Sequence, residues 1–230
     1  DSTSADFSPS ERTPRRIGVL RELMNDVSPA MKERFDEAIA RLKEGGAEIV
    51  DVSIPSAGPA LAAYYIINFA EVSTNLARFD GIRYGVAKRG ATPIEDYIRS
   101  RSEGFGKETK RRILLGTYVL SAGYIDAYYR KADAARGLLR KEYEAAFESV
   151  DVIVTPTMPT PAFVIGEKSD PLALYLEDIF TVTANLTGLP AISVPMGTID
   201  GLPVGLHFIG PMGEDNLVFK AGALVTGETL

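Results

Sequence analysis

A strand, helix, strand pattern near the beginning of the chain constrains its fold most strongly. The apolar run at 16–20 is rich in residues that favour strands, and a second such run follows at 48–54. Between them a helix is expected over 28–43, with Ser28 as its N-cap and Gly45 just past its end. Two strands joined through a helix usually become parallel neighbours in one sheet, so the pattern indicates an α/β fold.

Helical patterns fill the middle of the chain. A helical region is expected over 57–151, with breaks near 81–93 and 104–106, and helical signals return over 171–185. Within the first region, the helix over 124–148 has an apolar face at helical spacing, formed by Tyr128, Ala132, Ala135, Leu139 and Tyr143.

Further strands are expected after this helical region. They lie at 150–155, 191–198 and 204–209, and the dipeptide Asp200-Gly201 predicts a hairpin between the last two. The elements together predict an α/β layered architecture. We expect a mixed sheet whose strands come from both ends of the chain, with a central helical region.

The composition excludes several kinds of chemistry. The 230 residues include no cysteine, which removes thiol nucleophiles and thiolate metal sites. The single histidine, His207, lies in an apolar strand pattern and is interpreted as a structural residue. The net charge of -6 argues against a surface covered with nucleic-acid-binding charge. Neither a nucleophile elbow nor a phosphate-binding glycine loop is present in the sequence.

The sequence also gives expectations about organisation and location. No apolar stretch approaches the roughly 20 residues that span a bilayer, and no signal-peptide core is present, so a soluble protein without membrane contact is expected. We expect a cytoplasmic location, with an organelle matrix as the alternative. Residues 1–15 are expected to form a loose polar leader. Because the chain begins with Asp1 and ends in an uncapped helical pattern, it is interpreted as one segment, 1–230, of a longer single domain.

Two polar segments in the helical region are candidates for function. One helix face carries residues at alternating spacings of four and three, and it is either a solvated face or the wall of a polar pocket or subunit contact. The locally basic stretch 99–112 is either a solvated face, a clamp for a carboxylate, or a patch that touches phosphate. The residues of the polar face are Tyr64, Asn68, Glu71, Asn75 and Arg78.

Asp178 is a third candidate because it lies on an otherwise apolar helical pattern. It is either a surface residue or the acceptor for a substrate ammonium group. Together with Arg112 it would bind a zwitterion, with the guanidinium holding a carboxylate and the acid holding an amine. The sequence leaves open whether the two residues meet.

Several strings resemble the family of glutamyl-tRNA(Gln) amidotransferase A subunits, which are amidase-signature proteins. The most specific are EVSTNLARFDGIRYG at 71–85 and RSEGFGKETKRRILLG at 101–116. Further similar strings are YIDAYYRK at 124–131, DVIVTP at 151–156, DPLALY at 170–175, NLTGLP at 185–190 and GLPVG at 201–205.

The resemblance implies a fold, an activity and partners. It implies an amidase-signature α/β/α fold and a glutaminase that uses a Ser, cis-Ser, Lys triad. The ammonia released would pass to a partner that amidates Glu-tRNA(Gln) to Gln-tRNA(Gln), with ATP and Mg²⁺ used by that partner subunit and none by this chain. The implied partners are glutamine, subunits B and C, and Glu-tRNA(Gln) through the complex.

The resemblance also implies which residues this chain would contribute. The family's triad lies around a Gly/Ser-rich stretch that this sequence lacks, so the chain resembles only the C-terminal half of the family's proteins. No catalytic residue is therefore assigned to this chain, and the isolated chain is expected to be inactive. Tyr64 matches a substrate-contacting tyrosine, Arg112 the arginine that holds the substrate α-carboxylate, and Asp178 the acid that takes the α-ammonium group. His207 replaces a common Gln, and Met196 replaces a frequent Cys.

Two alternatives stay open at this point. The first is another amidase-signature hydrolase, acting on an amide that is not an amino acid. The second is a naturally short, non-catalytic α/β binding module that uses the polar face beginning at Tyr64 as its interaction surface.

Overall fold

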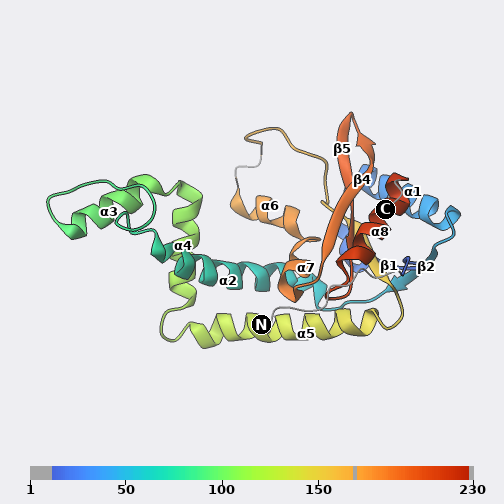
Figure 1. Cartoon of the computed structure of the whole chain (residues 1–230), viewed down its shortest axis with the longest axis horizontal. Helices are drawn as coiled ribbons and strands as arrows, with labels where there is room; N and C mark the ends of the chain where they lie inside the picture. The colour runs from blue at the N-terminus through green and yellow to red at the C-terminus, as the bar shows by residue number, and fades with distance from the viewer. Residues whose placement is uncertain (1–11, 168–169, 228–230) are drawn as a thin grey trace. The chain divides into compact units, whose positions relative to one another are not determined.

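The computed structural model describes residues 12–167 and 170–227 (Figure 1). The chain divides into two compact units, one formed by Asp1–Leu61 with Arg136–Leu230 and the other by Ala62–Ala135. Each unit is considered by itself below. Of the predicted polar leader, residues 1–11 lie outside the described part of the chain.

The first unit contains a five-stranded mixed sheet with the strand order β2-β1-β3-β5-β4. β1 pairs in parallel with both β2 and β3, whereas β5 is antiparallel to both β3 and β4. The predicted mixed sheet with strands from both ends of the chain is therefore confirmed. The strands are β1 (Arg16–Leu20), β2 (Glu48–Val52), β3 (Val152–Pro156), β4 (Ala191–Ile199) and β5 (Leu202–Ile209).

The connection from β1 to β2 forms as the sequence predicts. Helix α1 (Pro29–Glu44) begins after Ser28, whose side chain accepts the backbone N–H of Met31 at 3.3 Å. Gly18 in the middle of β1 is tightly enclosed, because a Cβ there would lie 2.9 Å from Val52 Cγ1. A strand packed this closely on its neighbours accepts no larger residue at that position.

A buried carboxylate fixes the beginning of β1. Asp151, just before β3, accepts the backbone N–H groups of Arg15 and Arg16 at 2.9 and 2.8 Å. It also accepts the guanidinium of Arg12 at 2.7 Å. These three hydrogen bonds stabilise the ionised carboxylate of Asp151 in its buried position.

The hairpin between β4 and β5 turns at the predicted dipeptide. Asp200 and Gly201 have φ values of 51° and 79°, the left-handed pair that a type I′ turn requires. β5 begins at Leu202, two residues earlier than predicted. A register shift between Pro195 and Gly197 bends β4, which is one of the two edge strands of this sheet.

Helices cover both faces of this sheet. α1 and α8 (Asp215–Thr226) contact each other and β4 on one side, and Figure 1 shows α7 (Val182–Thr187) on the other. The buried Tyr143 in α5 (Arg130–Ala146) donates to Thr183 Oγ1 at 2.8 Å. The predicted helix over 171–185 is broken into α6 (Pro171–Tyr175), the short 3₁₀ helix η4 (Leu176–Asp178) and α7.

The second unit is helical. The breaks between its helices fall close to the predicted positions. Helix α4 packs closely on α2 at Gly116, where an added Cβ would lie only 1.9 Å from the carbonyl oxygen of Phe69. None of the described helices is long and apolar enough to cross a membrane. The elements are α2 (Ala57–Asn75), which begins in the first unit, η2 (Leu76–Arg78), α3 (Pro93–Gly104), α4 (Lys107–Val119) and the π-helical turn η3 (Ile125–Tyr129).

One predicted helix face is only partly correct. Ala132, Leu139 and Tyr143 are buried as expected, and Ala135 is partly buried, but Tyr128 is exposed. Tyr128 lies in the π-helical turn η3, whose i→i+5 hydrogen bonding interrupts the α-helical period. The expected apolar face therefore begins only after that turn.

Candidate functional site

Arg112 lies on α4, one turn after an acid that holds it. Its Nε donates to Glu108 Oε1 at 3.0 Å, and the neighbouring Arg111 donates to Glu108 Oε2 at 2.5 Å. The two arginines thus use different oxygens of one carboxylate. This contact engages Nε of Arg112 and so restricts the orientation of its guanidinium plane.

An aromatic series on α2 links Arg112 to Tyr64 within the second unit. The guanidinium carbon of Arg112 lies 6.0 Å from the ring centroid of Phe69. Phe69 contacts Tyr65 at 5.4 Å between centroids, and Tyr65 meets Tyr64 edge to face at 5.2 Å. Tyr64 itself is half-buried. Two of the three predicted substrate contacts therefore lie on neighbouring helices, α2 and α4.

Asp178 is the last residue of η4, in the first unit, and is half-buried. Its backbone carbonyl accepts both the N–H and the hydroxyl of Thr181, at 3.0 and 3.1 Å. Because Asp178 belongs to a different unit from Tyr64 and Arg112, the meeting of the three side chains stays a prediction.

Glu177, the residue before Asp178, has no role predicted from the sequence. Its side chain is buried and accepts the hydroxyl of Thr160 at 2.8 Å. This bond ties η4 to the proline-rich loop that follows β3. The signal that singled out Asp178, an acid on an apolar helical pattern, applied equally to Glu177.

The polar face of α2 borders a shallow hollow. Arg78 donates to the backbone and side-chain oxygens of Asn75 at 2.9 and 2.8 Å. Glu71 and Asn75 line a hollow of about 180 Å³ together with Thr74 and Tyr129. Of the five residues of the face, Glu71 and Asn75 line this hollow and both are exposed, so the choice between a solvated face and a pocket wall stays open.

Much of the basic stretch 99–112 is used inside the second unit. Arg101 donates to the carbonyl oxygens of Leu76, the first residue of η2, and Phe79, which follows η2, at 2.9 and 3.0 Å. Lys110 donates to the carbonyl oxygen of Ser102 at 2.5 Å. These contacts give Arg101 and Lys110 structural roles.

His207 is the structural strand residue that its sequence pattern predicts. It lies in β5 opposite Thr155 of β3, with Nδ1 3.4 Å from the threonine hydroxyl. Desolvation by burial lowers the pKa of His207 to about 4. The ring is therefore neutral at physiological pH.

A second hollow, in the first unit, was not found from sequence. It measures about 350 Å³ and is lined mainly by apolar residues, including Met31 and Phe163. Thr157 and Ser193 contribute hydroxyls 2.6 Å apart. A Cβ at Gly205 would lie 2.5 Å from Ser193 Oγ, so glycine makes room for this pair.

The described residues hold no group of three or more His, Cys, Asp or Glu side chains arranged to bind a metal ion. Among the described side chains, the Arg112 guanidinium is suited to bind a carboxylate.

Comparison with known proteins decides the family. The family described as Amidase matches residues 1–219. The chain belongs to the amidase family. Within that family it is similar to amidotransferase A subunits, which confirms the resemblance noted in the motifs.

Two curated relatives illustrate this similarity. The A subunit of glutamyl-tRNA(Gln) amidotransferase from Caldanaerobacter subterraneus subsp. tengcongensis is 57% identical over 198 residues, covering 85% of this chain and 41% of the relative. The protein of the same name from Latilactobacillus sakei is 47% identical over 233 residues, covering 96% of this chain and 48% of the relative. This amidase-family chain thus spans about half the length of the relatives it matches.

Solved structures agree with this assignment. The crystal structure of the glutamyl-tRNA(Gln) amidotransferase A subunit from Thermotoga maritima matches with a TM-score of 0.68 and 37% identity, over 94% of this chain and 43% of that one. A crystal structure described as an amidase matches with a TM-score of 0.74 at 23% identity, over 96% of this chain and 47% of that one, which supports the fold alone. The predicted amidase-signature α/β fold is confirmed.

Proposed function

We propose that this chain is the C-terminal part of the glutaminase subunit of a glutamyl-tRNA(Gln) amidotransferase. The whole subunit would hydrolyse glutamine, and the ammonia would serve the ATP-dependent amidation of Glu-tRNA(Gln). Its partners would be subunits B and C, with ATP and Mg²⁺ used by the partner subunit and the tRNA bound through the complex, in the cytoplasm or an organelle matrix. Similarity to amidotransferase A subunits across most of the chain is the observation that carries this proposal.

The proposed contribution of this chain is glutamine recognition. Arg112 would hold the α-carboxylate, Asp178 the α-ammonium group, and Tyr64 would also contact the substrate. A free amino acid differs from a glutamine side chain within a protein by these two charged ends, so a site that binds both selects the free form. The Glu108 contact supports this role because it restricts the guanidinium of Arg112 before substrate arrives.

The hydrolytic step would use residues outside this chain. The sequence lacks the Gly/Ser-rich stretch of the Ser, cis-Ser, Lys triad, so no nucleophile is assigned here. Holding both charged ends would place the side-chain amide at a fixed distance from such a nucleophile, and this positioning would accelerate the attack. The isolated chain is accordingly expected to show no glutaminase activity.

Arg112→Ala tests the proposal in the protein encoded by the longest reading frame that contains this chain. Loss of a charge contact to substrate should reduce kcat/KM for glutamine by the equivalent of about 2 to 5 kcal/mol. Arg111→Ala is the matched control because Arg111 binds the same Glu108 carboxylate but is not assigned to substrate. Equal glutamine kinetics in the two variants would refute the role of Arg112.

A second substrate separates this proposal from a general amidase. Asp178→Asn should weaken glutamine use but leave the hydrolysis of a simple aliphatic amide unchanged, because that amide has no ammonium group to bind. If the unaltered protein prefers aliphatic amides to glutamine, another amidase-signature hydrolase is the better assignment. If the reading frame begins at this chain and encodes no triad, the non-catalytic binding module is favoured.

A further inference from the structure

Glu177 is a buried acid that has no part in the proposed recognition of glutamine, although it directly precedes Asp178 in η4. It is only 6% exposed, and its Oε2 accepts the hydroxyl of Thr160 at 2.8 Å. Burying a carboxyl group costs free energy unless hydrogen bonds satisfy it. The contact with Thr160 therefore helps to hold η4 where it lies.

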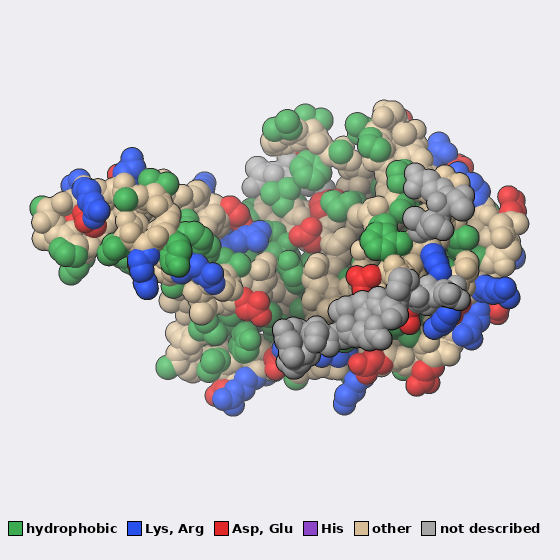
Figure 2. All heavy atoms as spheres, in the orientation of Figure 1, with side chains coloured by type: hydrophobic (Ala, Val, Ile, Leu, Met, Phe, Trp, Pro, Cys, Tyr) green, Lys and Arg blue, Asp and Glu red, His purple; other side chains and the backbone are tan. Residues whose placement is uncertain are grey.

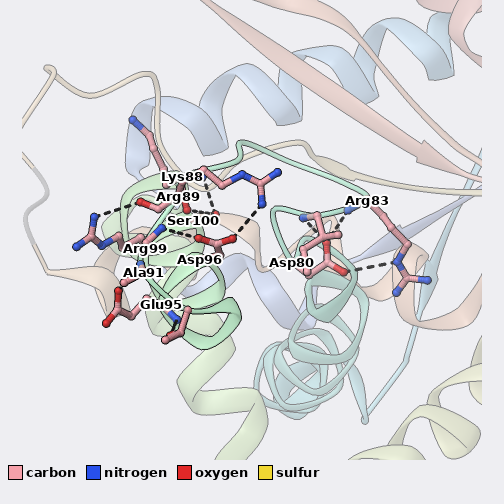
Figure 3. Close-up of polar contacts among 12 residues, drawn as sticks. Asp80, Arg83, Lys88, Arg89, Ala91, Glu95, Asp96, Arg99 and Ser100 are labelled. Atoms are coloured by element: carbon pink, nitrogen blue, oxygen red, sulfur yellow. Dashed lines mark hydrogen bonds and ion pairs between the residues drawn. The ribbon is translucent and has the colours of Figure 1, made fainter.

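Other acids of the chain show what such a contact does. In the second unit, the Asp80 carboxylate accepts the N–H of Ile82, and the Asp96 carboxylate accepts the N–H of Gly90 (Figure 3). Each of these bonds fixes a segment within six residues of the acid. The bond to Glu177 instead joins positions 17 residues apart, so it fastens two separate segments to each other.

Thr160 belongs to a firmly held segment, 157–161, which follows β3 and which we call the proline loop. The first N–H of this loop donates to the carbonyl of Gly205 in β5 at 2.9 Å, and the carbonyl of Pro159 accepts the N–H of Ser28 at 3.0 Å. Thr160 also stands between two prolines, which restrict the backbone around it. The Thr160 hydroxyl is therefore fixed relative to the sheet and to the beginning of α1.

The burial pattern around η4 separates Asp178 from the anchoring residues. Glu177 and Phe180 are both buried, and residues three apart on a tight helical turn lie on one face. Asp178 lies off that face and is half-buried. Hydrophobic side chains are visible at the surface of the part of the chain that contains α6 (Figure 2). The exposed leucines of α6 and η4 are Leu172, Leu174 and Leu176. Within the described chain, η4 is thus held mainly from the side of Glu177 and Phe180.

We propose that Glu177 is a positioning residue that fixes η4 on the proline loop and so places the Asp178 carboxylate for the α-ammonium group of glutamine. The inference rests on the proposed function, in which Asp178 binds that group. Because the two residues are adjacent, a shift of η4 away from Thr160 would move the Asp178 carboxylate with it. A contact that is ordered in advance costs less entropy when the substrate binds. Glu177 would thus support selection of the free amino acid without touching it.

Thr160→Val tests this role in the protein encoded by the longest reading frame that contains this chain. Valine is close to threonine in shape but has no hydroxyl, so the bond to Glu177 is lost. We expect kcat/KM for glutamine to fall by about tenfold, because the Asp178 carboxylate is misplaced. Hydrolysis of a simple aliphatic amide should stay unchanged, since that amide has no ammonium group. Thr160→Ser and Glu177→Gln keep a donor and an acceptor, so both should use glutamine almost normally.

A second variant covers the case in which Thr160→Val does not fold. The double variant Thr160→Val, Glu177→Met replaces both partners of the bond with apolar side chains, so neither is left buried with a lost hydrogen bond. We expect it to fold and to show the same loss, confined to glutamine.

A further cycle of variants separates positioning from a general loss of structure. Once Asp178→Asn has removed the ammonium contact, adding Thr160→Val should lower kcat/KM for glutamine by less than about twofold. Tyr143→Phe is the matched control, because it removes another buried hydroxyl that donates at 2.8 Å in the same unit. The ratio of glutamine to aliphatic-amide hydrolysis should not change in this control, even if its melting temperature falls.

Each outcome bears on a different statement. Unchanged glutamine kinetics in Thr160→Val, while Asp178→Asn weakens glutamine use, overturns the role of Glu177 and leaves the proposed function standing. An equal loss of glutamine and aliphatic-amide hydrolysis also overturns it, because the bond would then serve stability alone. If Asp178→Asn itself leaves glutamine use unchanged, the proposed recognition of glutamine fails and this inference fails with it.

Discussion

Asp151 shows how one side chain can determine where a strand begins. Burial by itself raises the pKa of Asp151, but hydrogen bonds from the backbone of Arg16 and Arg15 and from the Arg12 side chain outweigh that effect and lower it overall. We expect Asp151→Asn to destabilise the protein by about 1 to 3 kcal/mol at pH 7, measured by urea unfolding. The Asn side chain is neutral and has a single oxygen that can accept these hydrogen bonds, whereas the Asp carboxylate is charged and has two.

The pH dependence gives a further check on Asp151. Because its folded pKa lies below the unfolded value near 3.8, the carboxylate stabilises the fold above that value and loses this effect as the pH falls through the folded pKa. The difference between Asp151→Asn and the unaltered protein should therefore shrink in acid. Asp51→Asn, at an exposed ion pair with Arg21, should change stability by less than about 0.5 kcal/mol. A larger effect at Asp51 than at Asp151 would contradict this account.

His207 should make the protein sensitive to acid at a higher pH than Asp151 does. Its folded pKa of about 4 lies below the unfolded value of 6.5, so the unfolded state binds more protons between these values. Stability is expected to fall by about 3 kcal/mol as the pH is lowered from 6.5 to 4. His207→Gln should remove this part of the pH dependence, as followed by urea unfolding at several pH values. An identical pH profile in the variant would show that the histidine is not buried as described.

At the scale of elements, the contact between α2 and α4 depends on one glycine. Gly116→Ala would place a methyl group 1.9 Å from the carbonyl oxygen of Phe69, so the helices must separate. We expect a loss of about 2 kcal/mol or more in unfolding free energy. Arg112 lies one turn earlier on α4, so the same change should also move its guanidinium relative to Phe69.

Gly137 in α5 is the matched control for Gly116. A Cβ at Gly137 meets nothing within 4 Å, and its backbone has no positive φ. Gly137→Ala should therefore stabilise the helix by about 0.5 to 1 kcal/mol. If both substitutions shift the melting temperature in the same direction, helix propensity rather than packing governs these positions.

For the whole molecule, net charge should control self-association. The chain carries a net charge of -6 at pH 7, and its pI is about 5.0. Many large apolar side chains are exposed among the described residues, so reducing charge repulsion should favour association. Light scattering at constant protein concentration is expected to rise between pH 7 and pH 5 while circular dichroism still reports a folded chain. Equal scattering at both pH values would show that the exposed apolar groups do not associate.

Local signals in the sequence predicted most of the elements. Ser28 and the glycines after α1 define a complete helix, and Asp200-Gly201 defines a hairpin, because capping and turn geometry depend only on neighbouring residues. The same reasoning missed the π-helical turn at Tyr128 and the breaks between α6 and α7, where tertiary packing alters the local period.

The sequence by itself determined the α/β class, the family resemblance, and the choice of Tyr64, Arg112 and Asp178. Tertiary structure alone decided that Arg112 lies over Phe69 and shares Glu108 with Arg111. It also decided that Glu177 is buried on Thr160, and that Asp80 and Asp96 are largely covered while their ion-pair partners Arg83 and Arg89 are exposed. Turns and caps depend on a few adjacent residues, whereas burial and charge orientation depend on which distant segments pack together, and that becomes defined only when the chain folds.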